Sequence, residues 1–233
     1  MTKRYERLGC DHNAVFALVY LRTTEEYKRY WETGAFDDPT WLNHYDAVFG
    51  QFYFDAYDDW YGKDGAATPP AWRIAFHAAD TREVTGMGNI FLGMNGHIRR
   101  DLPFVLEAIG LTNEDGTTRK ADHDRVNEFL NHVSTYVMDE AAAHHDPSID
   151  DGIDVPYTTV DQTASIHAIV EWREEAWRKA EMLLNASTPE ERDRIAAWIE
   201  NEAAASALAI RHLFTQDSSE IRDAHCGAWL AGT

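Results

Sequence analysis

The sequence has few lysines, few cysteines and no long apolar segment. Only five of its 233 residues are lysine, and 40 Asp and Glu residues outnumber 21 Lys and Arg residues, which gives a formal net charge of −19. Binding to a nucleic-acid backbone requires clustered basic residues, so no nucleic-acid partner is expected. A membrane-spanning helix needs about 18 or more consecutive apolar residues. No window of the sequence approaches this length, so no membrane span is expected.

Cysteine occurs only twice, at Cys10 and Cys226, near opposite ends of the chain. Two cysteines do not make a disulfide scaffold, and their spacing matches no metal-binding motif. The sequence leaves open whether they form one bridge. The first residues contain no apolar stretch of the kind found in a signal peptide. We therefore expect a cytoplasmic protein.

The excess of acidic residues indicates a protein from a salt-rich cytoplasm. Repulsion among so many like charges destabilises a compact state at low ionic strength and is relieved when salt screens it. An aspartate-rich, lysine-poor surface is what a halophilic protein is expected to have. An ordinary acidic protein is the alternative.

Hydrophobic residues recur with a period close to 3.6 along nearly the whole chain, which predicts α-helices. Thr23 and Glu26 have the spacing of a capping box, which predicts that a helix begins at Thr23. No strand pattern, internal repeat or low-complexity linker is found. We predict an all-α fold, a single bundle-like domain of about seven to nine helices over residues 1–233, with a short irregular segment at the N-terminus and an irregular C-terminal tail. The predicted helices cover residues 14–22, a segment from 23 to before 38, and 39–60, 70–79, 83–100, a stretch ending at 109 after a break near Pro103, 122–145, 161–185 and 189–214.

The most unusual segment is residues 93–103, with the sequence GMNGHIRRDLP. His97 and Asp101 are four residues apart, so on a helix they share one face. This spacing lets both side chains bind one cation, or lets the carboxylate orient the imidazole. Asn95 and Gly96 are poor formers of a helix interior, which favours a functional role for the segment. In the alternative interpretation, Asp101 caps the next helix and His97 is a satisfied buried histidine.

A second pair with the same spacing occurs at His167 and Glu171. Together with His12 and Asp55, the two pairs form a set of His, Asp and Glu residues on several helices. Inward-facing residues of these types build metal sites in helical bundles, and such sites activate water for hydrolysis. We therefore predict a divalent metal, either zinc, manganese or magnesium. The alternative is that His167 and Glu171 form an ordinary surface pair.

A polar line on the predicted helix 122–145 marks a further candidate region. Asn127 and Asn131 lie one turn apart on one face, and Thr135 and Asp139 continue the line. Such a line faces either solvent or a cavity. The chain also contains eight tryptophans and ten tyrosines, which predicts an aromatic-lined pocket or a core with hydrated edges.

The segment 93–103, followed by Asp124-Arg125-Val126-Asn127, resembles an uncharacterised family of helical bacterial and archaeal proteins. Pro70-Ala71-Trp72 and the element from Arg173 to Trp177 match further elements of that family. This resemblance covers most of the chain and implies an all-helical fold, but no activity is attached to the family.

The two histidine–carboxylate pairs are also similar to those of the zinc-dependent phospholipase C and single-strand nuclease group, which is all-helical. That resemblance implies that His97, Asp101, His167 and Glu171 bind metal, with His12 and Asp55 as earlier ligands. The chain departs from this group because it lacks the group's N-terminal tryptophan and has no histidine between residues 102 and 118.

Three functions are consistent with these features. The leading hypothesis is a metal-dependent enzyme that hydrolyses a phosphoester or a lipid-like small molecule. In this enzyme Asn95, His97, Asp101 and Asn127 would serve catalysis or orient the substrate. The alternatives are diphosphate chemistry on an isoprenoid, and a non-catalytic binding protein whose buried Asn, His and Asp residues form a polar network that fixes the fold.

Overall fold

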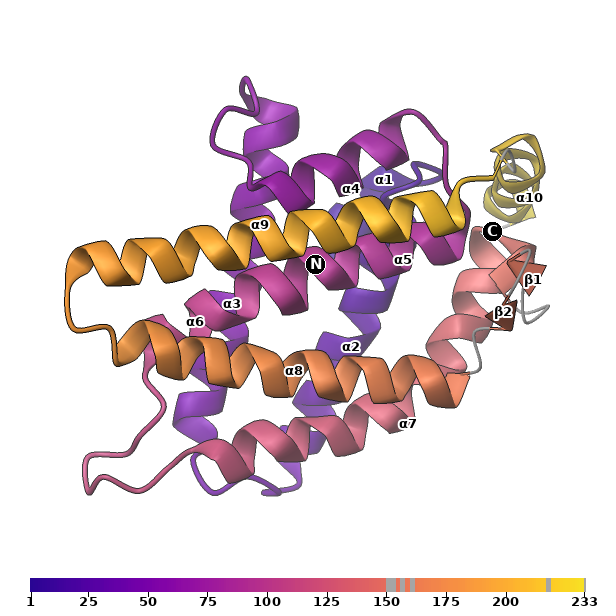
Figure 1. The fold of residues 1–233 in the computed structure, drawn as a ribbon. Helices are drawn as coiled ribbons and strands as arrows, with labels where there is room; N and C mark the ends of the chain where they lie inside the picture. The colour runs from indigo at the N-terminus through magenta and orange to yellow at the C-terminus, as the bar shows by residue number, and fades with distance from the viewer. Residues whose placement is uncertain (150–153, 156–157, 160–161, 217–218, 233) are drawn as a thin grey trace.

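The computed structural model describes residues 1–149, 154–155, 158–159, 162–216 and 219–232, and it confirms the all-α fold (Figure 1). Its described part contains ten α-helices, a π-helical turn, a 3-10 turn and two short paired strands. These are α1 (Thr2–Leu8), α2 (Ala14–Glu32), α3 (Pro39–Gly62), α4 (Pro70–Asp80), α5 (Gly86–Met94), η1 (Asn95–Asp101), α6 (Leu102–Ile109), α7 (Lys120–His144), η2 (Pro147–Ile149), β1 (Asp154–Val155), β2 (Thr158–Thr159), α8 (Gln162–Leu184), α9 (Pro189–Phe214) and α10 (Ser219–Gly232).

Three predictions about individual elements were wrong. The N-terminal segment is the helix α1 and the C-terminal tail is the helix α10, so neither end is irregular. No helix begins at Thr23, because α2 runs without interruption through that residue. The hydroxyl groups of Thr23 and Thr24 instead donate to the carbonyl groups of Val19 and Tyr20, four residues earlier. This bond back to the preceding turn competes with the N-cap arrangement that the sequence pattern predicted.

Side-chain caps fix the start of two long helices. The Asp38 carboxylate accepts a hydrogen bond from the backbone N–H of Trp41 at the start of α3. The Thr188 hydroxyl accepts one from the backbone N–H of Glu191 at the start of α9. Each cap is followed by a proline at the first helical position, where the missing N–H costs nothing. The sequence signals at these two positions were therefore sufficient to predict where α3 and α9 begin.

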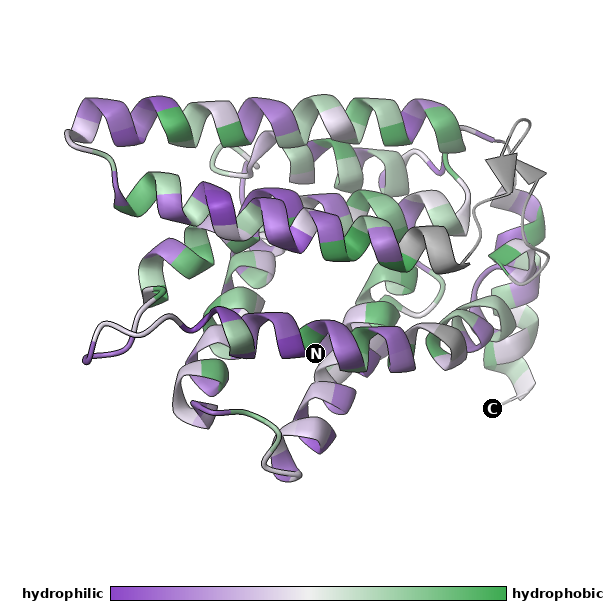
Figure 2. Ribbon diagram, turned by 60° about the horizontal axis from the view of Figure 1, so that its bottom comes forward, coloured by the Kyte–Doolittle hydropathy of each residue, from purple (hydrophilic) through white to green (hydrophobic). Residues whose placement is uncertain are grey.

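The continuous helical segment α5–η1–α6 lies at the centre of the fold. It packs against α2, α3, α4, α8 and α9. Around it, α9 covers α4, α8 lies antiparallel beside α9, and α7 runs alongside both α2 and α8 (Figure 1). The long outer helices carry hydrophilic and hydrophobic residues in alternation, as expected for helices with one face on the core (Figure 2). No helix in the described ranges is long and apolar enough to cross a membrane.

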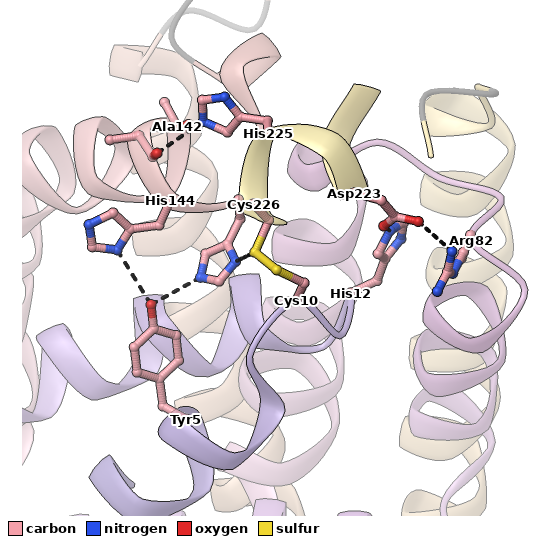
Figure 3. The surroundings of a disulfide bond; sticks show 11 residues. Tyr5, Cys10, His12, Arg82, Ala142, His144, Asp223, His225 and Cys226 are labelled. Carbon is pink, nitrogen blue, oxygen red and sulfur yellow. Dashed lines mark hydrogen bonds and ion pairs between the residues drawn. A yellow bond between two sulfur atoms is a disulfide. The ribbon is translucent and has the colours of Figure 1, made fainter. Parts of the chain in front are cut away.

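A disulfide joins the two ends of the fold. Cys10, between α1 and α2, is bonded to Cys226 of α10, with a Cα–Cα distance of 5.7 Å (Figure 3). The sequence left open whether the two cysteines pair, and the structure shows that they do. His145, at the end of α7, lies beside it, with its Nδ1 atom 3.7 Å from the Cys226 sulfur. The bridge therefore connects α10 to the same end of the bundle as the C-terminus of α7.

Candidate functional site

The predicted polar pair lies on a π-helical turn inside a longer helix over residues 86–109. At the end of this turn, the backbone N–H of Leu102 donates to the carbonyl of His97, five residues earlier. Pro103 has no N–H and cannot donate to a carbonyl four residues earlier, which favours a change of register here. The break predicted near Pro103 is this change of register rather than an interruption. Single π-helical turns occur frequently at functional sites.

Gly96 is required on this turn because a tryptophan packs directly against its backbone. A Cβ atom at this position would lie 2.8 Å from the Trp72 ring, closer than side-chain carbons approach one another. Trp72 is buried, and its indole N–H donates to Asp101 at 2.9 Å. The glycine that looked unfavourable in the sequence therefore has a packing role.

Asp101 is the centre of a buried hydrogen-bond network. In addition to the Trp72 bond, its carboxylate accepts from Arg100 at 2.9 Å and lies 3.4 Å from His97 Nδ1. Arg100 in turn donates to Glu200 of α9 at 2.5 Å and 2.8 Å. The side chain of Asp101 makes no cap hydrogen bond to α6, so the alternative interpretation of this residue was wrong. Its position instead ties η1 to α4 and α9.

His97 is a neutral imidazole in aromatic surroundings. Its ring stacks on Phe49 at a centroid distance of 3.5 Å and meets the edge of Tyr20 at 4.6 Å. Burial lowers its pKa, and this effect outweighs the opposite effect of Asp101. The contact with the carboxylate assigns the proton to Nδ1. Nε2 is buried and has no hydrogen-bond partner among the described residues, so His97 is not the satisfied histidine of the alternative interpretation.

His97 forms part of the wall of an apolar cavity between α2, α3, η1, α7 and α8. The cavity has a volume of about 120 Å³. Most of the lining is aliphatic or aromatic, and α7 contributes a row of such residues from Val126 to Met138. The polar line from Asn127 to Asp139 lies on another face of α7, where Asn131 and Asp139 are exposed.

Asp46 and Arg173 place charges in this apolar wall. Burial raises the pKa of Asp46 to about 6, because the ionised carboxylate loses hydration there. Arg173 is buried on α8, and its guanidinium donates to Asn127 and Tyr45 and to a backbone carbonyl of α7. The cavity therefore has an ionisable acid and a fixed cation in addition to His97.

The structure brings together one of the two predicted histidine–carboxylate pairs in a buried site. His97 and Asp101 are buried and in contact. His167 and Glu171 are exposed on α8. Asp55 is also exposed, and its carboxylate accepts a hydrogen bond from a neighbouring glutamine on α3.

The remaining candidate ligand, His12, is buried near the disulfide, where its Nε2 atom lies 3.2 Å from Asp223 (Figure 3). Among the residues that the structure describes, no group of three or more His, Cys, Asp or Glu side chains is arranged to hold a metal ion. Metal-dependent hydrolysis thus stays a prediction, based on the His97–Asp101 pair.

The two predicted asparagines connect helices. The Asn95 side chain is fully buried and donates to the carbonyl of Ala203 in α9 at 2.9 Å. The Asn127 side chain accepts from Arg173 Nε at 2.8 Å and so connects α7 to α8. Asn127 therefore positions a residue of the cavity wall.

Asp46 and Arg173 did not emerge as site residues from the sequence. Asp46 stands in the otherwise apolar run from Tyr45 to Phe49, and this was a signal for a carboxylate in hydrophobic surroundings. Arg173 follows Ile166 and Ile169 on one face of α8, which placed a cation on an apolar stripe. Neither pattern showed which helices would meet there.

The comparison with known families supports one of the two resemblances. A family description matches residues 1–213. The chain belongs to DUF5995, a family of unknown function. This confirms membership of an uncharacterised family. No curated protein and no solved structure matches the chain. The match ends before α10, so Cys226 and its helix lie beyond the matched residues.

Proposed function

We propose that the protein binds an apolar small molecule in the cavity between α2, α3, η1, α7 and α8. The observation that carries the proposal is the lining: aliphatic and aromatic side chains surround a space of about 120 Å³, and few polar groups reach it. Small-molecule sites are commonly apolar cavities between helices, with a small number of placed polar groups. His97, Asp46 and Arg173 are the placed groups here.

The shape of the cavity favours a narrow chain as the ligand. Its lining runs along α2 from Phe16 to Tyr27, which corresponds to roughly 16 Å of helix. Because the lining extends over several helical turns, the cavity suits an unbranched alkyl chain better than a compact ring.

This proposal develops the binding-protein hypothesis from the sequence. The Asp101 network holds η1 against α4 and α9, and it leaves His97 as a wall residue of the cavity. The hydrolase and isoprenoid hypotheses both require a bound divalent ion, for which the described residues supply one candidate pair of ligands. An apolar ligand site requires no metal ligands, so the residues that line the cavity are sufficient for it.

Octan-1-ol is a suitable neutral probe because it combines one alkyl chain with one hydroxyl group. We expect isothermal titration calorimetry to show saturable binding at one site, with the negative heat-capacity change of apolar burial. Val133 lines the cavity and is buried. Val133→Phe fills part of the cavity, and we expect it to weaken binding by about tenfold or more, the equivalent of 1.4 kcal/mol.

Leu208→Phe is the matched control, because Leu208 is exposed on α9 and is not one of the residues that line the cavity. Val133→Leu is a milder filling variant for use if Val133→Phe does not fold. Octan-1-ol that binds equally well to the filled variants would show that the cavity is not the ligand site.

A further inference from the structure

Arg173 differs from the other buried basic side chains of the described residues. Three Lys or Arg side chains are buried there: Arg173, Lys179 and Arg222. Lys179 Nζ lies 2.7 Å from Glu202, and Arg222 Nε lies 3.2 Å from Asp146. Arg173 forms no ion pair with a described carboxylate, and its hydrogen-bond partners are neutral. Burial of a cation without a counter-ion is costly, so this arrangement requires a reason.

Three neutral oxygen atoms hold the Arg173 guanidinium in place. Nε donates to Asn127 Oδ1 at 2.8 Å, Nη1 to the Tyr45 hydroxyl at 3.2 Å, and Nη2 to the His123 carbonyl at 2.7 Å. A guanidinium group has five N–H donors. Two donors are therefore left without a partner in the described part of the chain, on a group whose plane is already fixed.

Three carboxylates lie within two residues of Arg173 in the chain. Two of them are engaged with other cations, and the third, Glu171, is exposed and forms no ion pair with Arg173 in the described part of the chain. Glu174 pairs with Lys120 at 2.7 Å, and Glu175 lies 3.5 Å from Arg99. Neither is available to neutralise the buried guanidinium.

Asp46 is the one carboxylate among the described cavity-lining residues. Its pKa is raised by burial, with no opposing effect of Arg173. No ion pair joins Asp46 to Arg173 among the described residues, and the guanidinium donates to other groups, so Asp46 does not neutralise it. The cavity thus has a cation whose counter-ion is not supplied by the described protein residues.

We propose that the ligand is an aliphatic carboxylate, whose carboxylate group pairs with Arg173 while its chain lies along the apolar lining. This inference rests on the proposed function and names its ligand class. The guanidinium fork matches the two oxygen atoms of a carboxylate. Ile169 and Ile166 continue the lining of α8 from Arg173, four and seven residues earlier on the same face. The guanidinium of Arg173 therefore lies at one end of the apolar lining along which the alkyl chain of the ligand would lie.

Octanoate and octan-1-ol form a matched pair of probes, because they share a chain length and differ in charge. Their dissociation constants are measured by calorimetry on the full chain at pH 7.5. We expect octanoate to bind about tenfold more tightly or better, since hydrogen bonds to charged groups contribute effects of this size. In Arg173→Met the ratio of the two constants should fall to about one, while Arg173→Lys should retain part of the preference.

Arg178→Met is the control, because Arg178 is an exposed arginine on the same helix; it should keep the full preference. If octan-1-ol binds and octanoate binds no more tightly, the inference is overturned and the proposed function stands. A preference that persists in Arg173→Met also overturns it. Absence of binding for both probes overturns the proposed function itself. If Arg173→Met does not fold, the ratio of the octanoate and octan-1-ol dissociation constants of the unmodified protein still tests the inference.

Discussion

At the scale of single residues, burial sets the charge of the groups around the cavity. It raises the pKa of Asp46 to about 6 and lowers that of His97. His97 is therefore neutral near pH 7, whereas Asp46 changes its charge close to pH 6. The electrostatic balance of the cavity thus depends on pH through Asp46.

Asp46→Asn is expected to stabilise the protein at neutral pH. The folded-state pKa of Asp46 lies above its ordinary value of 3.8, so the folded protein holds the proton more strongly than the unfolded chain. Stability therefore falls as pH rises from about 4 to 6, and the full penalty, roughly 3 kcal/mol at most, applies above pH 6. Urea unfolding at pH 5 and pH 7.5 should show a gain from the substitution that is larger at pH 7.5.

Asp55→Asn provides the matched comparison, since it removes the same charge from an exposed position on the same helix. Both substitutions reduce the general repulsion of an acidic protein, and only Asp46→Asn removes a half-buried carboxylate. Equal gains at both positions, with the same pH dependence, would mean that burial of Asp46 has no effect on stability.

The sequence was sufficient to predict the contact between His97 and Asp101, but it was not sufficient to predict the cavity. His97 and Asp101 meet because a spacing of four places them on one face, which depends on one helix alone. Arg173 meets Tyr45 and Asn127 because α3, α7 and α8 converge, and residue spacing within one helix contains no information about that convergence. The six proposed metal ligands needed several helices to converge in the same way, and in the described structure they do not form one group.

At the scale of elements, the π-helical turn η1 depends on small residues that allow close packing. Gly96 accommodates the Trp72 ring, and Gly93 accommodates the ring of Phe16. A Cβ atom at Gly93 would lie 2.3 Å from that ring. Phe16 also lines the cavity. The close packing of its ring against Gly93 therefore fixes the position of one wall of the cavity.

Gly96→Ala is expected to destabilise the protein by about 1 to 3 kcal/mol, the usual cost of inserting a methyl group into a packed core. In an open helical position the same substitution is stabilising by about 0.5 to 1 kcal/mol. Gly227, inside α10, has no atom within 4 Å of its added Cβ, and Gly227→Ala is therefore the control. Denaturant unfolding of both variants measures the difference. A Gly96→Ala variant as stable as Gly227→Ala would contradict the packing role.

Element boundaries followed from the sequence where a local signal was decisive. The starts of α3 and α9 have a capping side chain and a proline, and both were predicted correctly. The capping-box pattern at Thr23 failed because α2 continues through it and packs along α7. The helix α1 was missed because it has only seven residues, too few for a clear local pattern. The helix α10 was missed because it is held by the disulfide and by its packing against α7, which no local pattern shows.

At the scale of the whole molecule, the disulfide attaches α10 to the body of the fold. Around it, the Tyr5 hydroxyl lies 3.0 Å from His145 Nε2, and His225 of α10 contacts the carbonyl of Ala142 in α7 (Figure 3). Disulfides are rare in a reducing cytoplasm. The bridge therefore does not favour the cytoplasmic location expected from the sequence. That location stays a prediction.

Reduction of the bridge between Cys10 and Cys226 is expected to lower the free energy of unfolding by as much as about 5 kcal/mol. The two cysteines are 216 residues apart, and a bridge that closes such a long loop restricts the unfolded chain strongly in the chain-entropy model. Urea unfolding with and without dithiothreitol measures the change, and alkylation with iodoacetamide followed by mass measurement verifies that both thiols are released. A variant with Cys10→Ala and Cys226→Ala should show no response to dithiothreitol. If the reduced and oxidised proteins unfold at the same denaturant concentration, the bridge does not stabilise the fold, and α10 is held by its hydrogen bonds and ion pairs alone.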